Sequence, residues 1–130
     1  MLLFLVLTAG PALAGGAEAP AETSATGWLV LVDKGRFSEA WEKGATVFRN
    51  GLTREAWLES VTPVREALGR LEERSLLSAT PATSMPRGPK GEYLVLKFEA
   101  RFAAGVSMTE TVTTVKDPDG SWRVAGYFVR

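Results

Sequence analysis

The region from Gly91 to Arg130 constrains the fold most, because it contains three strand-like runs joined by two short connections. In the first run, Glu92 to Phe102, apolar residues occupy the even positions from Leu94 onward, and charged residues occupy the odd positions from Lys97 onward. This alternation is typical of a strand with one buried face. The second run, 106–115, is rich in β-branched residues, and 121–130 forms the third. Together the three runs predict an antiparallel meander.

Both connections carry residues that favour tight turns. Ala103-Ala104-Gly105 joins the first two runs, and Asp117-Pro118-Asp119-Gly120 joins the second and third. In the latter, the proline presets φ at the first corner and the glycine can adopt the left-handed conformation that closes the turn. We therefore expect two hairpins in succession.

A turn at 103–105 sets the register of the first hairpin and places Glu110 on its apolar face. Counting back from the turn puts Met108 opposite Ala100 and Glu110 opposite Phe98. A buried carboxylate must find a partner or take up a proton. Glu110 is therefore the residue that most needs an explanation.

The composition excludes several classes of function. A chain of 130 residues is expected to form one domain, and its formal net charge of zero argues against nucleic acid as a partner. The sequence has no cysteine and no histidine, which removes disulfides, thiol chemistry and the commonest metal ligands. We therefore expect no cofactor and no metal. We expect a binding or structural domain rather than an enzyme.

Residues 1–14 resemble the apolar core of a secretory signal, with Ala12-Leu13-Ala14 as the cleavage site. A basic residue before the apolar run is missing, which a start codon assigned too far downstream would explain. The alternative is an N-terminal element buried in the fold. We expect export to the periplasm or beyond, no stable membrane span after cleavage, a linker over 15–23, and a single domain over 24–130.

Three helical segments are expected before the sheet. Apolar residues at helical spacing predict a first helix over about Glu22–Lys34 and a second over 37–48, weakened by Gly44. Thr53 is a good N-cap for a third helix, in which Pro63 is expected to cause a kink or a break.

A further strand is expected over Arg74–Thr83, where Pro81 indicates an edge strand, followed by an exposed loop over 85–91. Helices followed by an antiparallel sheet define an α+β class. The predicted architecture is three N-terminal helical segments packed on a curved four-stranded antiparallel sheet.

This order of elements, with its tryptophans and its final Ser-Trp-Arg-Val-Ala-Gly-Tyr run, resembles the cone-shaped fold of the nuclear transport factor 2-like superfamily. Within it, the sequence is most similar to the bacterial exported family called domain of unknown function 4019. The resemblance covers about Thr26 to Arg130 and implies the fold but no activity. The residues that carry it are Trp28, Gly35, Phe37, Trp41, Phe48, Trp57, Arg65, Leu68-Gly69, Arg74, Gly91-Glu92-Tyr93, Phe98, Glu110 to Thr113 and Gly120 to Tyr127.

The residues expected to contact a ligand are those that would surround Glu110. Arg65 would face Glu110 from the third helix, and Trp57, Phe98 and Met108 would complete an apolar wall. Such a pair could orient a polar ligand or accept a proton. The alternatives are a structural ion pair and a glutamate turned to solvent at a bulge.

The outer face of the sheet is a second candidate surface. Strict alternation places Tyr93 and Tyr127 there, beside Val95, Val115 and Val129, where they could form a homodimer contact or an ordinary surface. Three functions therefore stay open. The first is a non-enzymatic domain that binds an apolar or amphipathic small molecule or a protein partner. The others are a proton-transfer enzyme of the isomerase or dehydratase type that uses Glu110, and a structural dimerisation module.

Overall fold

The computed structural model describes residues 18–130; the expected signal over residues 1–14 lies outside them. Four helices precede four strands, which confirms the α+β class with the helices N-terminal to the sheet. The elements are α1 (Glu18–Asp33), α2 (Phe37–Glu42), α3 (Thr46–Gly51), α4 (Arg54–Leu68), β1 (Leu71–Ala82), β2 (Tyr93–Phe102), β3 (Ser107–Lys116) and β4 (Trp122–Val129).

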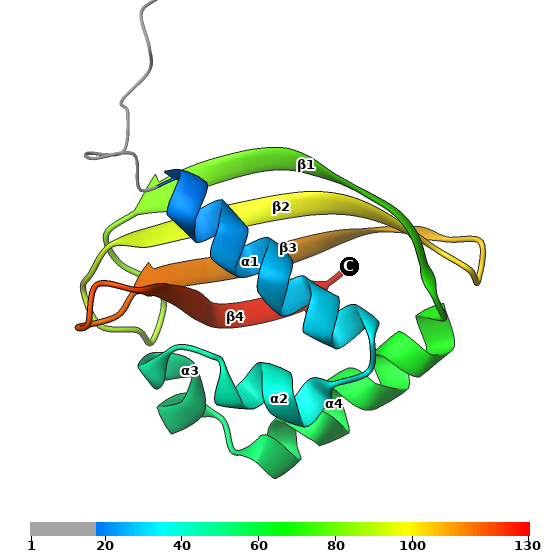
Figure 1. Ribbon diagram of the computed structural model, residues 1–130, viewed down its shortest axis with the longest axis horizontal. Coiled ribbons are helices and arrows are strands. Elements are labelled where there is room, and N and C mark those ends of the chain that lie inside the picture. Colours follow the sequence, from blue (N-terminus) through cyan, green and yellow to red (C-terminus); the bar gives the residue numbers. More distant parts are fainter. Residues whose placement is uncertain (1–17) are drawn as a thin grey trace, which may run out of the picture.

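The sheet is an open antiparallel meander in the order β1-β2-β3-β4, so β1 and β4 are its edges. The helices gather on one face of the curved sheet, with α1 lying across it and α2, α3 and α4 beyond the β4 side (Figure 1). Pro81 lies in an edge strand, as predicted, where its missing N–H costs no ladder hydrogen bond.

The helical segments differ from the prediction in two places. The second segment is divided into α2 and α3 around Gly44. A Cβ on Gly44 would lie 2.5 Å from Cδ1 of Phe48, so the glycine permits the close approach that seats this ring. The first helix begins at Glu18, within the range expected to be a linker, and Pro20 lies in its first turn, where proline is tolerated.

Pro63 does not divide α4, contrary to one of the two outcomes expected. The helix runs from Arg54 to Leu68 with Pro63 inside it, and its N-terminus is capped by the Thr53 hydroxyl, which accepts from the Ala56 N–H at 3.1 Å. The proline is exposed, so the carbonyl of Glu59 that loses its partner lies on the solvent side.

Both predicted hairpin turns are present. Gly105 and Gly120 have φ angles of 87° and 85°, and their N–H groups donate to Phe102 and Asp117 at 2.9 and 2.8 Å. The register is the one expected for the first hairpin, with Ala100 opposite Met108 and Phe98 opposite Glu110. Glu110 is fully buried on the inner face.

The expected outer position of Tyr127 is wrong, because β4 contains a bulge. Thr113 pairs with Gly126 but Thr114 pairs with Val124, so Ala125 is an extra residue. The bulge reverses the alternation, and Tyr127 and Val129 turn to the inner face, opposite Val112 and Glu110.

Tyr93 is also not a surface residue. It lies on the outer side of β2, but only 2% of it is exposed, because the β1–β2 loop covers it. Its hydroxyl donates to the Pro89 carbonyl at 2.6 Å. Val115, its neighbour on β3, is buried as well. The outer-face homodimer therefore loses most of the side chains expected to form it.

Candidate functional site

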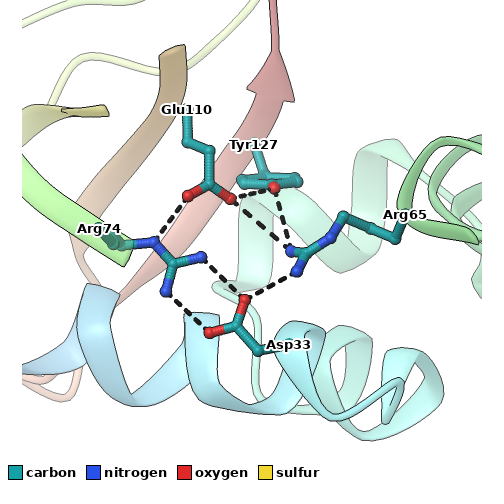
Figure 2. Close-up of polar contacts among 5 residues, drawn as sticks. All are labelled: Asp33, Arg65, Arg74, Glu110 and Tyr127. Carbon is teal, nitrogen blue, oxygen red and sulfur yellow. Dashed lines mark hydrogen bonds and ion pairs between the residues drawn. The ribbon is translucent and has the colours of Figure 1, made fainter. Parts of the chain in front are cut away.

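Five polar side chains from five different elements meet between the helices and the inner face of the sheet (Figure 2). Asp33 comes from the end of α1 and Arg65 from α4, while Arg74, Glu110 and Tyr127 come from β1, β3 and β4. We call these five residues the ion cluster. The cluster joins the first helix to the last strand and crosses the whole sheet.

Each acid in the ion cluster is held by two arginines. The guanidinium of Arg74 donates to Glu110 Oε1 at 2.7 Å and to both carboxylate oxygens of Asp33 at 2.8 Å. Arg65 donates to Asp33 Oδ1 at 2.9 Å, and its Nη1 lies 3.7 Å from Glu110 Oε2. The Tyr127 hydroxyl donates to Glu110 Oε2 and accepts from Arg65 at 3.4 Å. Both oxygens of Glu110 therefore have partners.

The ion cluster is electrically balanced, with two carboxylates and two guanidinium groups. Side-chain exposure is 0% for Glu110, 5% for Arg65, 13% for Arg74 and 17% for Asp33. Desolvation of charges at this depth is costly, and mutual pairing offsets that cost only while the set is complete. Among the described residues, Arg65 Nε is the buried side-chain nitrogen without a hydrogen-bond partner, and its guanidinium lies over the Phe102 ring at 4.9 Å.

The surroundings shift the pKa values of three cluster members, Asp33, Arg74 and Tyr127. Burial alone raises the pKa of Asp33, but hydrogen bonds from Arg74 and Arg65 outweigh burial and hold it below 3.8. Burial lowers the pKa of Arg74, and the bonds to Asp33 and Glu110 raise it further than burial lowers it. For Tyr127, burial and then the negative charge of Glu110 both raise the pKa above 10.0. Tyr127 is therefore a hydrogen-bond donor throughout the ordinary pH range.

An aromatic group fills the space beside the ion cluster. The Tyr127 ring lies 5.3 Å from Trp28 and 6.2 Å from Trp57, and both tryptophans also pack on Phe48. The indole N–H of Trp28 donates to the Ala40 carbonyl at 2.7 Å, and that of Trp57 donates to the Phe37 carbonyl at 2.9 Å. These bonds fix the positions of the two indole rings. The rings and the ion cluster together occupy the space between the helices and the sheet.

An open cavity lies at the free edge of β4, on the side of Trp57 and Tyr127 that faces away from the ion cluster. It has a volume of about 460 Å³ and is lined by residues of α3, α4, the β1–β2 loop and strands β2, β3 and β4; we call it the edge cavity. A second hollow of about 210 Å³ continues along the same strand and shares Trp57, Ser60 and Tyr127 with it. The residues lining the edge cavity are Val47, Phe48, Gly51, Leu52, Trp57, Ser60, Met85, Pro86, Arg87, Gly88, Tyr93, Thr113, Ala125, Gly126 and Tyr127.

Of the five residues predicted to surround a ligand, one lines the edge cavity and the others lie around Glu110 between the helices and the sheet. Glu110 and Arg65 belong to the ion cluster, and neither lines the edge cavity. Trp57 does line it. Phe98 is buried in the main core, and Met108 packs in a smaller cluster with Leu68, Ala100 and Phe102. The five residues therefore do not all line the edge cavity.

Sequence reasoning missed three members of the ion cluster and most of the edge cavity. Arg74 turns inward because Glu72 is an extra residue in β1, between the pairs Leu71–Phe102 and Glu73–Arg101. Asp33 follows the buried Val32 at the end of α1 and could have been suspected from that position. The inward position of Tyr127 was not predicted, because it results from the bulge at Ala125.

The described part of the chain offers no obvious metal site, since residues 18–130 contain no group of three or more potential acidic ligands close together. Within the same residues, no helix is long and apolar enough to cross a membrane.

The fold and the ion cluster define a small α+β domain with a charged, fully paired interior. The chain belongs to the family described as "Protein of unknown function (DUF4019)", whose model matches residues 24–127. A structure solved at 2.5 Å of a protein from Catenulispora acidiphila has a similar fold, with a TM-score of 0.56 and 14% identity over 88% of this chain and 90% of that one. At this identity the likeness concerns the fold alone. A comparison with curated proteins finds no significant match.

Replacing Glu110 by glutamine should destabilise the protein strongly, because it leaves one excess positive charge buried. The expected loss in the free energy of unfolding is about 3 to 5 kcal/mol, measured by urea denaturation. Glu99→Gln is the matched control: Glu99 is exposed on the outer side of β2, and its replacement should change stability by less than about 0.5 kcal/mol.

The double variant Glu110→Gln/Arg74→Gln restores electrical balance in the cluster. We expect it to be more stable than the sum of the two single losses predicts. Strict additivity, or a Glu110→Gln variant as stable as Glu99→Gln, would contradict the cluster as described.

The ionisation of Tyr127 can be observed alone, because the chain has two tyrosines and the other, Tyr93, can be replaced by phenylalanine. In Tyr93→Phe, tyrosinate absorbance should stay low as the pH passes 10 and should rise only as the protein unfolds. The folded-state pKa lies above the unfolded value, so the stability linked to Tyr127 is present below pH 10.0 and is lost as the pH rises beyond it. Half-ionisation near pH 10 in the folded protein would show that Tyr127 is not held as described.

Proposed function

We propose that this protein is a non-enzymatic binding domain that holds a small apolar or amphipathic molecule in the edge cavity. The observation that carries the proposal is the cavity itself. Its volume lies within the range of about 300 to 1,000 Å³ that is usual for ligand pockets, and apolar and aromatic side chains dominate its lining. Trp57 and Tyr127 present rigid ring surfaces that suit an apolar ligand.

The ion cluster favours binding over proton transfer. A general base needs an available lone pair within reach of the substrate. Both oxygens of Glu110 are engaged, by Arg74, Tyr127 and Arg65, and the residue has no exposed surface. A substrate would have to displace these partners in a space already filled by Trp28 and Trp57. We therefore assign the cluster to stability and the edge cavity to function.

The wider setting of the domain is also a proposal. The order of helices and strands and the packing of the helices on one face support placing it in the nuclear transport factor 2-like superfamily, whose interior is here filled by the ion cluster. The apolar residues 1–14 and the small-residue site at 12–14 support export. The ligand would then be met outside the cytoplasm.

The binding proposal is tested with N-phenylnaphthylamine, a neutral apolar fluorophore that brightens when it leaves water. The folded protein should bind it saturably at one site. Gly51→Phe should raise the dissociation constant at least about tenfold, because Gly51 lines the cavity with open space beyond its Cα, which the ring would occupy.

Gly27→Phe is the matched control for this experiment. Gly27 also has open space beyond its Cα but lies on α1, outside the edge cavity, where it lines a separate hollow of about 590 Å³ beside Trp122, so binding in the edge cavity should not change. The proposal fails if the fluorophore does not bind saturably, or if Gly51→Phe binds it as tightly as Gly27→Phe does.

A further inference from the structure

The edge cavity contains a single charge. Of its lining residues within the described chain, Arg87 alone has an ionised side chain, and the remainder are apolar, aromatic, small or hydroxyl-bearing. Arg87 is exposed, and within residues 18–130 it forms no ion pair. The cavity therefore combines an apolar wall with one cation whose hydrogen-bond donors are not used by a protein carboxylate.

The backbone holds Arg87 in place. Pro86 precedes it, and Gly88 and Pro89 follow. The Gly88 N–H donates to the Met85 carbonyl at 3.0 Å, and the Tyr93 hydroxyl fastens the loop through Pro89 at 2.6 Å. Two prolines and these hydrogen bonds reduce the freedom of the loop, so less entropy is lost when the guanidinium binds a ligand.

Arg87 is also the one non-glycine residue with positive φ in the described chain, at 63°. This left-handed conformation costs a residue with a side chain more than it costs glycine. Glycines lie close by in the same loop, yet an arginine occupies the left-handed position. Backbone strain of this kind tends to persist where a side chain has a function.

We propose that the edge cavity binds a single-chain amphiphile with a carboxylate head, such as a fatty acid, and that Arg87 holds the head. The inference rests on the proposed function and deepens it by naming the class of ligand. A guanidinium matches a carboxylate with two parallel hydrogen bonds. The alkyl chain then lies along the apolar wall toward Trp57 and Tyr127. A cationic amphiphile would meet Arg87 with the wrong charge, and a neutral one would leave its donors without an ionic partner.

The test compares decanoate, decanol and decyltrimethylammonium, which share one chain length and differ in the charge of the head. Each competes with N-phenylnaphthylamine for the protein. Decanoate should displace the fluorophore at a concentration about tenfold or more below that of the other two, because a hydrogen bond to a charged group contributes that much.

Arg87→Gln should remove the preference for decanoate, so that decanoate and decanol displace the fluorophore at similar concentrations. Lys90→Gln is the matched control, since Lys90 is an exposed cation of the same loop that does not line the cavity. It should keep the full preference. Circular dichroism verifies that both variants are folded.

The outcomes separate the two proposals. If the fluorophore binds but the three amphiphiles compete equally, or if Arg87→Gln keeps the preference, the carboxylate assignment is wrong and the binding function stands. If neither the fluorophore nor decanoate binds, both are wrong. Binding to vesicles of an anionic phospholipid without binding of free decanoate would also overturn the assignment, because it would indicate a membrane surface as the partner.

Discussion

The pairing of Asp33 and Glu110 with two arginines is the interaction on which the rest of the structure depends. It brings α1, α4, β1, β3 and β4 to one point (Figure 2). Charged groups at this depth are stable only as a complete set. An arrangement of the helices that broke one pair would leave a charge buried and unmatched, so the cluster favours this packing over its alternatives.

The cluster also determines where function can be located. It and the neighbouring rings of Trp28 and Trp57 fill the space between the helices and the sheet, which in a more open domain would hold a ligand. The edge cavity lies instead at the free edge of β4, beside α3, α4 and the β1–β2 loop. A separate hollow of about 590 Å³ lies beside α1 and Trp122 and carries two charged residues on its α2 side, Glu42 and Lys43, together with Arg123. Tyr127 contributes to both regions: its hydroxyl belongs to the ion cluster and the residue lines the cavity.

The features that could be predicted from the sequence are those that depend on residues close together in the chain. Turn residues gave both hairpins, and counting from the first turn gave the inward position of Glu110, since side chains alternate strictly along an unbroken strand. The inward positions of Tyr127 and Arg74 depend on bulges at Ala125 and Glu72. No sequence pattern indicates these bulges, so the two positions could not be predicted.

The partners of Glu110 and the edge cavity depend on long-range assembly. Arg65 was expected to face Glu110 and does, at 3.7 Å, but its shorter bond is to Asp33, which lies in a different helix. The cavity is assembled from α3, α4, the β1–β2 loop and strands β2, β3 and β4, segments that no local pattern connects.

The edge cavity, and not the ion cluster, is expected to bind the ligand, and the signals of two methionine methyl groups distinguish these locations. Met85 lines the cavity, whereas Met108 lies on the inner face of β3 beside Glu110. In a spectrum of the protein with labelled methionine methyl groups, added decanoate should shift the signal of Met85 and leave that of Met108 in place. A shift at Met108 without one at Met85 would locate binding at the ion cluster and contradict the account.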